Sequence, residues 1–249
     1  MLDSILEAMI TPIMKFMQIY IKKATASNSY HIPREVSSMF EVVHWVCKVR
    51  GYKTVVKFFP HEVNDLEPVV EMLHFQETDE WWIGYVLILW LSIIVLVPFD
   101  IDTIDSKKDI DILIKRIINI CKNHISNSGK IREATAVLLS KLLTRPDVLR
   151  SGETDYFLNY LAVEYQQSKD DANQMFHVSG ILQTLTEVFK IGHREDLLPR
   201  VNTVFDPILK TEVKGKFMAK STNLRKYKVQ LAQRIGCIFL KPKVTKWRY

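Results

Sequence analysis

Apolar residues recur along most of this chain at spacings of three and four, the period that lines one face of an α-helix. Three segments carry the pattern most clearly. They are the sets Leu2, Ile5, Leu6, Met9, Ile10, Ile13, Met14 and Met17; Val178, Ile181, Leu182, Leu185, Val188 and Phe189; and Leu224, Tyr227, Leu231, Ile235 and Ile238. The pattern predicts a helical protein, with a kink at Pro12 in the first helix.

The apolar runs also end at regular intervals. A proline, or a glycine beside a charged residue, follows each run, and both are helix-ending signals. The five ends fall 48 residues apart, at Arg50, Pro98, Pro146, Arg194 and Pro242. Ankyrin and tetratricopeptide arrays have shorter periods, whereas HEAT and armadillo arrays repeat at roughly 40–47 residues.

Each interval contains a second helical pattern. These partner helices are expected at 62–75, 109–122, 155–166 and 197–210. The predicted fold is therefore all-α, a HEAT/armadillo-type α-solenoid of about five stacked helix pairs.

We expect one solenoid domain over residues 1–249. It consists of an N-terminal helix at 1–22, a polar linker at 23–34 that ends near a proline, and HEAT-like repeats of about 48 residues over 35–249. With 47% hydrophobic and 25% charged residues the chain can bury a large core. Eight glycines are too few for the turns of a β-sandwich or barrel.

Three well-separated cysteines, Cys47, Cys121 and Cys237, fit a reducing compartment and read as small buried hydrophobes. No targeting segment is evident, so the cytoplasm is the expected location. Trp81 to Val97 is 17 residues without a charge, at the short limit for a membrane span. Acidic flanks on both sides favour a buried helix instead, and we expect no membrane span.

Enzyme and cofactor motifs are absent from the sequence. The glycines are never closer than 12 residues, which excludes dinucleotide and phosphate-cradling loops, and there is no nucleophile elbow or His-Glu-x-x-His pair. Five aspartates between Asp100 and Asp111 lack the glycine and closing glutamate of a calcium loop, and favour a solvated acidic loop. His44 is expected to be a hydrogen-bonded core residue. We therefore predict no catalytic residue, no cofactor and no metal site.

Positive charge is concentrated at the end of the chain. Residues 210–249 hold 12 of the 34 lysines and arginines and one acid, Glu212, a local charge of +11 within a chain of +6. Two interpretations stand: a solvated basic face, or a site for an acidic partner with aromatic anchoring. The candidate partner-binding residues are Lys241, Lys243, Lys246, Trp247 and Arg248. No nucleic-acid-binding motif accompanies them, and no nucleic-acid partner is expected.

Several unusual strings resemble the tubulin-folding cofactor D family. They occur in order from residue 49 to 249, whereas residues 1–40 match loosely. The strings are VRGYKTVVKFFPHEV (49–63), LILWLSIIVLVPFD (87–100), TRPDV (144–148), FKIGHREDLLP (189–199) and FLKPKVTKWRY (239–249). Members of this family are far longer, so the chain resembles only their N-terminal portion and is expected to be truncated relative to them.

The resemblance implies a chaperone that is not itself an enzyme. It implies binding of β-tubulin and a part in assembling or dismantling the αβ-tubulin heterodimer, with cofactors E and C and an Arf-like small GTPase as further partners. It also implies stimulation of GTP hydrolysis within that complex, and a cytoplasmic location with microtubule or centrosome association. The alternative is a generic HEAT-repeat scaffold or adaptor with no tubulin role.

Overall fold

The computed structural model describes residues 5–76, 80–101 and 110–241, and every regular element in these ranges is helical. The chain consists of two compact units, Met1–Leu142 and Leu143–Tyr249. That the two form a single continuous solenoid stays a prediction. The helices are α1 (Leu6–Ala26), α2 (Arg34–Arg50), α3 (Tyr52–Val55), α4 (Leu66–His74), α5 (Trp81–Ile94), α6 (Ile110–Ile125), α7 (Lys130–Leu143), α8 (Pro146–Ser151), α9 (Glu153–Ser168), α10 (Met175–Ile191), α11 (Arg194–Leu197), α12 (Val201–Val204), α13 (Lys216–Lys220) and α14 (Thr222–Phe239).

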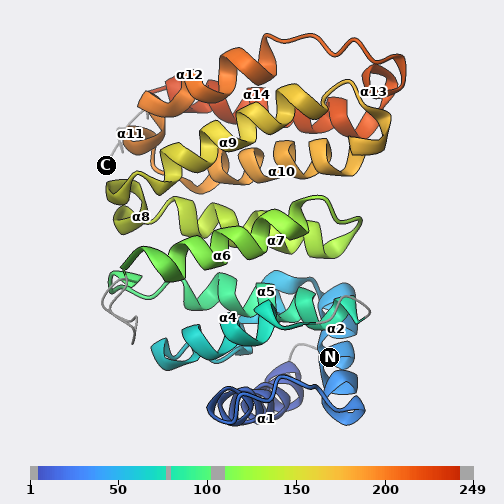
Figure 1. Cartoon of the computed structure of the whole chain (residues 1–249), viewed down its shortest axis with the longest axis vertical. Helices are drawn as coiled ribbons and strands as arrows, with labels where there is room; N and C mark the ends of the chain where they lie inside the picture. The colour runs from blue at the N-terminus through green and yellow to red at the C-terminus, as the bar shows by residue number, and fades with distance from the viewer. Residues whose placement is uncertain (1–4, 77–79, 102–109, 242–249) are drawn as a thin grey trace, which may run out of the picture. The chain divides into compact units, whose positions relative to one another are not determined.

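The long helices pack as successive pairs (Figure 1). In unit 1, α4 contacts both α1 and α6, and α5 packs on both α2 and α4. In unit 2, α9 packs on α12 and α10 packs on α14. Helices α9 and α10 run antiparallel, since Glu164 near the end of α9 contacts His177 near the start of α10 (3.1 Å). Within the described residues this is the predicted ARM/HEAT-type all-α packing.

Side-chain hydrogen bonds that span one repeat join equivalent positions, in or beside the helices of consecutive pairs. Each joins residues 45 to 49 positions apart, close to the period of the sequence pattern. Along the α1, α4 and α6 side of unit 1, Gln18 donates to Asp65 (2.8 Å) and Arg116 to Glu71 (2.8 Å). We call these contacts repeat-spanning bonds. The others are Trp82 to Ser37, Lys141 to the Ser92 carbonyl, Arg200 to Asp155, and Gln166 to Thr211.

The helix ends confirm the regular spacing. The second helix of each pair ends at Arg50, Ile94, Leu143, Ile191 and Phe239, so successive ends lie 44, 49, 48 and 48 residues apart. Pro146 occupies the first turn of α8, where its missing amide leaves no helical bond unmade. Gly51 ends α2 with a positive φ of 82°, which glycine adopts at low energetic cost because it has no Cβ.

The uncharged segment expected to be buried is the core helix of unit 1. Eleven of the 14 residues of α5 are buried, so it contacts neighbours on all sides. At about 1.5 Å per residue, α5 covers about 21 Å, less than the roughly 30 Å of a bilayer core. Among the described helices none is both long and apolar enough to cross a membrane.

Several local expectations need correction. Helix α1 continues to Ala26 because Ile21 and Ala24 are buried on its packed face, so the non-helical segment is 27–33 and not 23–34. Pro12 lies inside this continuous helix, and the kink expected there stays a prediction. Met9 on the same helix and Ile5 directly before it are exposed, because α1 packs through a narrower face than its apolar pattern indicated.

The expected helix at 197–210 is broken. It consists of a 3-10 turn at Leu198–Arg200, the short α12, and a π-helical turn at Phe205–Leu209. Pro199 and Pro207 have no backbone N–H, so they cannot donate the hydrogen bonds that a continuous α-helix requires.

Cysteine burial also departs from expectation. Cys47 and Cys121 are buried as expected, whereas Cys237 is exposed because it lies on the outward side of α14.

Candidate partner-binding surfaces

The basic end of the chain is only partly covered by the structure. Lys241 directly follows α14 and is exposed, while Lys243, Lys246, Trp247 and Arg248 lie outside the described residues. Eight further cations lie between 210 and 240, and six of them are exposed: Lys210, Lys214, Lys216, Lys220, Arg225 and Lys226. The positive charge of this segment therefore faces solvent over most of its described length.

A small pocket of about 280 Å³ lies within unit 2, between α9, α10, α14 and the segment 212–219 that covers it. We call it the unit-2 pocket. Its apolar lining includes Val178 and Leu182 of α10, Met218 of α13 and Leu224 of α14, all of which are buried. Three cations also line it: Lys169, Arg225 and Lys228. Cations beside an apolar floor suit a ligand that is both acidic and partly apolar.

The covering segment is fastened to the end of α9. The carboxylate of Asp170 accepts hydrogen bonds from the backbone amides of Lys214 (2.6 Å) and Gly215 (3.1 Å), and these bonds lower the pKa of Asp170. Gln166 donates to the Pro207 carbonyl and to the Thr211 hydroxyl (3.0 Å). A Cβ at Gly215 would lie 2.8 Å from the Asp170 carbonyl oxygen, so only glycine fits this approach. Specific contacts therefore hold the covering segment in place over the pocket.

A second surface lies on unit 1. Trp45 and Val49 of α2 are 49% and 70% exposed, and Trp81 of α5 is 43% exposed. Lys48 lies 4.3 Å from the centre of the Trp45 ring, and the Trp45 indole donates to Glu41 (3.2 Å). We call Val42, Trp45, Val49 and Trp81 the α2–α5 aromatic surface. Exposed tryptophans beside a cation are typical of protein-binding sites.

Sequence reasoning missed this surface, although a signal was present. Val42, Trp45 and Val49 form a second apolar row on α2 at spacings of three and four, beside the buried row of Phe40, Val43 and Cys47. Two apolar rows on one helix indicate that one of them serves something other than the core.

His44 lies beneath the aromatic surface. It is buried as expected, in edge contact with Trp81 (4.6 Å) and Tyr85 (5.2 Å). Its Nδ1 has no hydrogen-bond partner among the described residues, so the expectation of a hydrogen-bonded histidine is not met at that atom. Aromatic packing holds this ring in place.

A hollow beside His44 contains reactive residue types, including Cys47, Tyr85, Lys130 and Glu133. Burial raises the pKa of the Cys47 thiol to about 12 and lowers the pKa of His44. A nucleophilic cysteine needs a lowered pKa and a base beside it. The cluster is therefore suited to packing and not to covalent chemistry.

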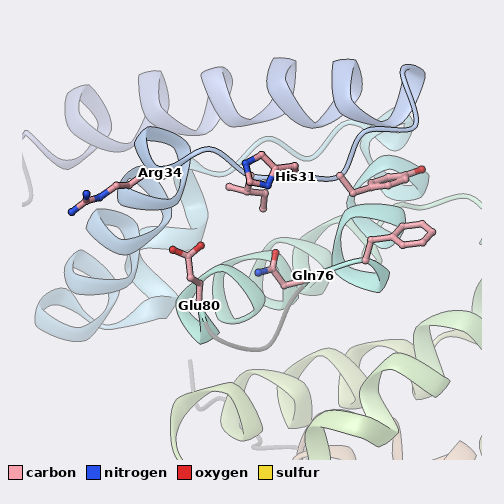
Figure 2. Close-up of a pocket in the computed structure, with 7 residues that line it drawn as sticks. His31, Arg34, Gln76 and Glu80 are labelled. Carbon is pink, nitrogen blue, oxygen red and sulfur yellow. The ribbon is translucent and has the colours of Figure 1, made fainter.

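Another hollow, of about 790 Å³, lies where the 27–33 segment crosses the end of α4. Figure 2 shows His31 and Arg34 on one side of it, with Gln76 and Glu80 on the other. The stacked rings of Tyr30 and Phe75 (4.2 Å between centres) lie at its edge. Its polar lining is solvated, and within the described part of the chain no group of three His, Cys, Asp or Glu residues could hold a metal ion.

A comparison with known protein families identifies the family of this chain. Residues 1–164 match the model of the "Tubulin-specific chaperone D-like, ARM repeat" family. The chain belongs to this tubulin-specific chaperone D-like family. The match takes in the whole of unit 1, with the α2–α5 aromatic surface, and the first helices of unit 2.

Two curated relatives agree with the chaperone D-like assignment. The Tubulin-folding cofactor D of Schizosaccharomyces pombe is 28% identical over 216 residues, which are 86% of this chain and 18% of the relative. The Tubulin-specific chaperone D of Dictyostelium discoideum is 25% identical over 325 aligned positions, covering 95% of this chain and 21% of the relative. The chain thus spans about a fifth of the length of these relatives. No solved structure matches it significantly.

Proposed function

We propose that this chain is a tubulin-folding chaperone of the cofactor D type that binds β-tubulin. In this role it takes part in assembling or dismantling the αβ-tubulin heterodimer after tubulin leaves the cytosolic chaperonin. The observation that carries the proposal is the family match over residues 1–164. Repeat arrays bind folded partners over extended surfaces, which suits the capture of a whole subunit.

The α2–α5 aromatic surface supports a binding role within the matched region. Its side chains are large, apolar and exposed, and tryptophan is among the residues that dominate binding energy at interfaces. We propose that it contacts the tubulin subunit directly. A non-catalytic role is consistent with the raised thiol pKa and lowered imidazole pKa of the nearby cysteine and histidine.

We further propose that the chain acts with tubulin-folding cofactors E and C and an Arf-like small GTPase. Any stimulation of GTP hydrolysis then belongs to the assembled complex, since the chain carries no catalytic motif of its own. The corresponding location is the cytoplasm, with microtubule or centrosome association. These partners are implied by the resemblance to cofactor D.

Capture of β-tubulin tests the function. We expect the immobilised 249-residue chain to retain β-tubulin from cytosol. The double variant W45S/V49S should bind it about thirtyfold more weakly, because two truncated interface anchors at about 1 kcal/mol each cost about 2 kcal/mol together. V229S, at an equally exposed valine of α14, is the matched control and should behave as the wild type. Retention of a phosphatase or transport receptor in place of tubulin would instead support the generic scaffold.

The basic end of the chain is proposed to steer or hold the acidic tubulin surface. Reversing Lys241, Lys243 and Lys246 to glutamate should weaken tubulin binding about tenfold at low salt and less at high salt, because exposed charges act through screened attraction. Surface plasmon resonance at two salt concentrations measures this.

The control variant replaces three exposed lysines of unit 1 by glutamate: Lys15, Lys23 and Lys57. Equal losses in both triple variants would mean that overall charge, and not this segment, governs binding. Unchanged binding in the first variant would exclude the segment.

A further inference from the structure

The unit-2 pocket contains a buried hydroxyl that lacks a partner. Tyr165 of α9 lines the pocket and its side chain is fully buried, yet its hydroxyl oxygen makes no hydrogen bond to any described residue. Burial raises its pKa to about 12, so the group remains a neutral donor. Leaving such a group unpaired is unfavourable, and native structures seldom do so without reason. A ligand oxygen in the pocket would supply the missing acceptor.

The cations of the pocket point to an acidic ligand. Lys228 is half-buried, its ammonium donates to the Thr211 carbonyl (3.2 Å), and it lies 5.7 Å from the centre of the Tyr165 ring. Burial, and after it the charge of Lys169, lower the pKa of Lys228. Two ammonium groups are thus close enough to repel each other, and a bound anion would relieve both effects.

Nearby acids do not neutralise this cluster. Glu212 lines the pocket but is exposed to solvent. Asp170 directs its carboxylate to the amides of Lys214 and Gly215. The Asp170 carboxylate also attracts Lys169, but the three cations Lys169, Arg225 and Lys228 outnumber these two carboxylates, which leaves the pocket positively charged.

The apolar floor distinguishes a peptide from a simple anion. Val178, Leu182, Met218 and Leu224 offer a buried surface that phosphate or acetate cannot use, and about 280 Å³ accommodates one large apolar side chain. A nucleic acid is disfavoured because, among the lining residues that the structure describes, the aromatic ring of Tyr165 is buried and offers no exposed face on which a base could stack.

We propose that the unit-2 pocket binds a short acidic peptide segment of a partner protein, with one apolar side chain on the floor and a neighbouring carboxylate among Lys169, Arg225 and Lys228. The Tyr165 hydroxyl donates to that carboxylate. This site is separate from the α2–α5 aromatic surface, and it exists whether or not the partner is β-tubulin.

Fluorescence anisotropy with the 249-residue chain tests the site. The probe is a short fluorescein-labelled peptide of glutamates around a single phenylalanine. Lys228→Gln should weaken binding about tenfold and Lys169→Gln about threefold, since the first removes a half-buried charge and the second a rim charge. Tyr165→Phe deletes only the hydroxyl and should weaken binding about fivefold, with the thermal melting curve unchanged or improved.

Matched controls separate this site from general charge attraction. Lys226→Gln, at an exposed lysine of α14 that does not line the pocket, should bind as the wild type, and a peptide with serine in place of phenylalanine should bind about tenfold more weakly. Equal losses at Lys226 and Lys228, or displacement of the peptide by inorganic phosphate at equal concentration, would overturn the proposal. So would wild-type affinity in the Tyr165→Phe and Lys228→Gln variants. If the pocket variants lose peptide binding but still capture tubulin, the pocket is a peptide site that does not depend on the proposed function.

Discussion

Replacing Trp90 by alanine should lower the free energy of unfolding of unit 1 by about 3–5 kcal/mol, the usual range for removing a fully buried tryptophan. Trp90 lies in the middle of α5 and is 0% exposed. Its indole donates to the Pro60 carbonyl (2.6 Å), which ties the segment after α3 to the core helix. The variant loses the packing of the ring and leaves that carbonyl without its donor.

Urea unfolding followed by tryptophan fluorescence measures this loss. Trp45, Trp81 and Trp82 remain in unit 1 as reporters after the substitution. Trp81→Ala is the control, because this side chain is partly exposed and its removal should cost about 1 kcal/mol or less. A similar shift of the urea midpoint for both variants would contradict the larger contribution to stability expected of Trp90.

Breaking the buried ion pair of unit 2 is expected to have an effect of similar size. Arg145 and Asp147 are 8% and 5% exposed, and two parallel hydrogen bonds join them: Nε to Oδ1 at 2.9 Å and Nη2 to Oδ2 at 2.8 Å. The pair fixes the turn between α7 and α8. Arg145→Met should cost about 3–5 kcal/mol, because it removes one charge of a buried, doubly hydrogen-bonded ion pair and leaves the other in place.

A double variant decides whether the loss of stability comes from disrupting this ion pair. Arg145→Met with Asp147→Leu removes both charges and should recover most of the stability lost in the single variant. The exposed pair of Lys190 and Glu187 provides a control, since Lys190→Ala should cost about 1 kcal/mol or less. Circular dichroism during urea unfolding gives the comparison, and additive losses in the double variant would refute the explanation.

The helical period and the helix ends could be predicted from the sequence because they depend on local chemistry. The rows of apolar residues on α10 are buried as expected, and Gly192 follows the last residue of that helix. Proline and glycine act on the backbone at their own positions, so their effect does not depend on what packs around them.

Predictions failed where the outcome depended on packing between distant parts of the chain. Met9 follows the apolar period of α1 but is exposed, since the neighbouring helices leave that part of α1 uncovered. The exposed Cys237 has the same cause on α14. Periodicity identifies an apolar face but does not say how much of it a neighbour covers.

The candidate sites show the same limit. The basic segment was visible as a run of charges, whereas the unit-2 pocket combines Tyr165 and Lys169 at the end of α9 with Lys228 on α14. These residues are far apart in sequence and become neighbours because α14 packs on α10 and because Asp170 and Gln166 hold the intervening segment in place. No local pattern could have brought them together.

The repeat-spanning bonds constrain how members of this family change length during evolution. Deleting one residue inside α9 would turn the rest of the helix by about 100° and separate Asp155 or Gln166 from its partner one repeat later. A loop such as 27–33 can lengthen while the bond between Gln18 and Asp65 on either side of it survives. Insertions carried by longer relatives should therefore fall between helices, leaving the bonded positions in register from one species to the next.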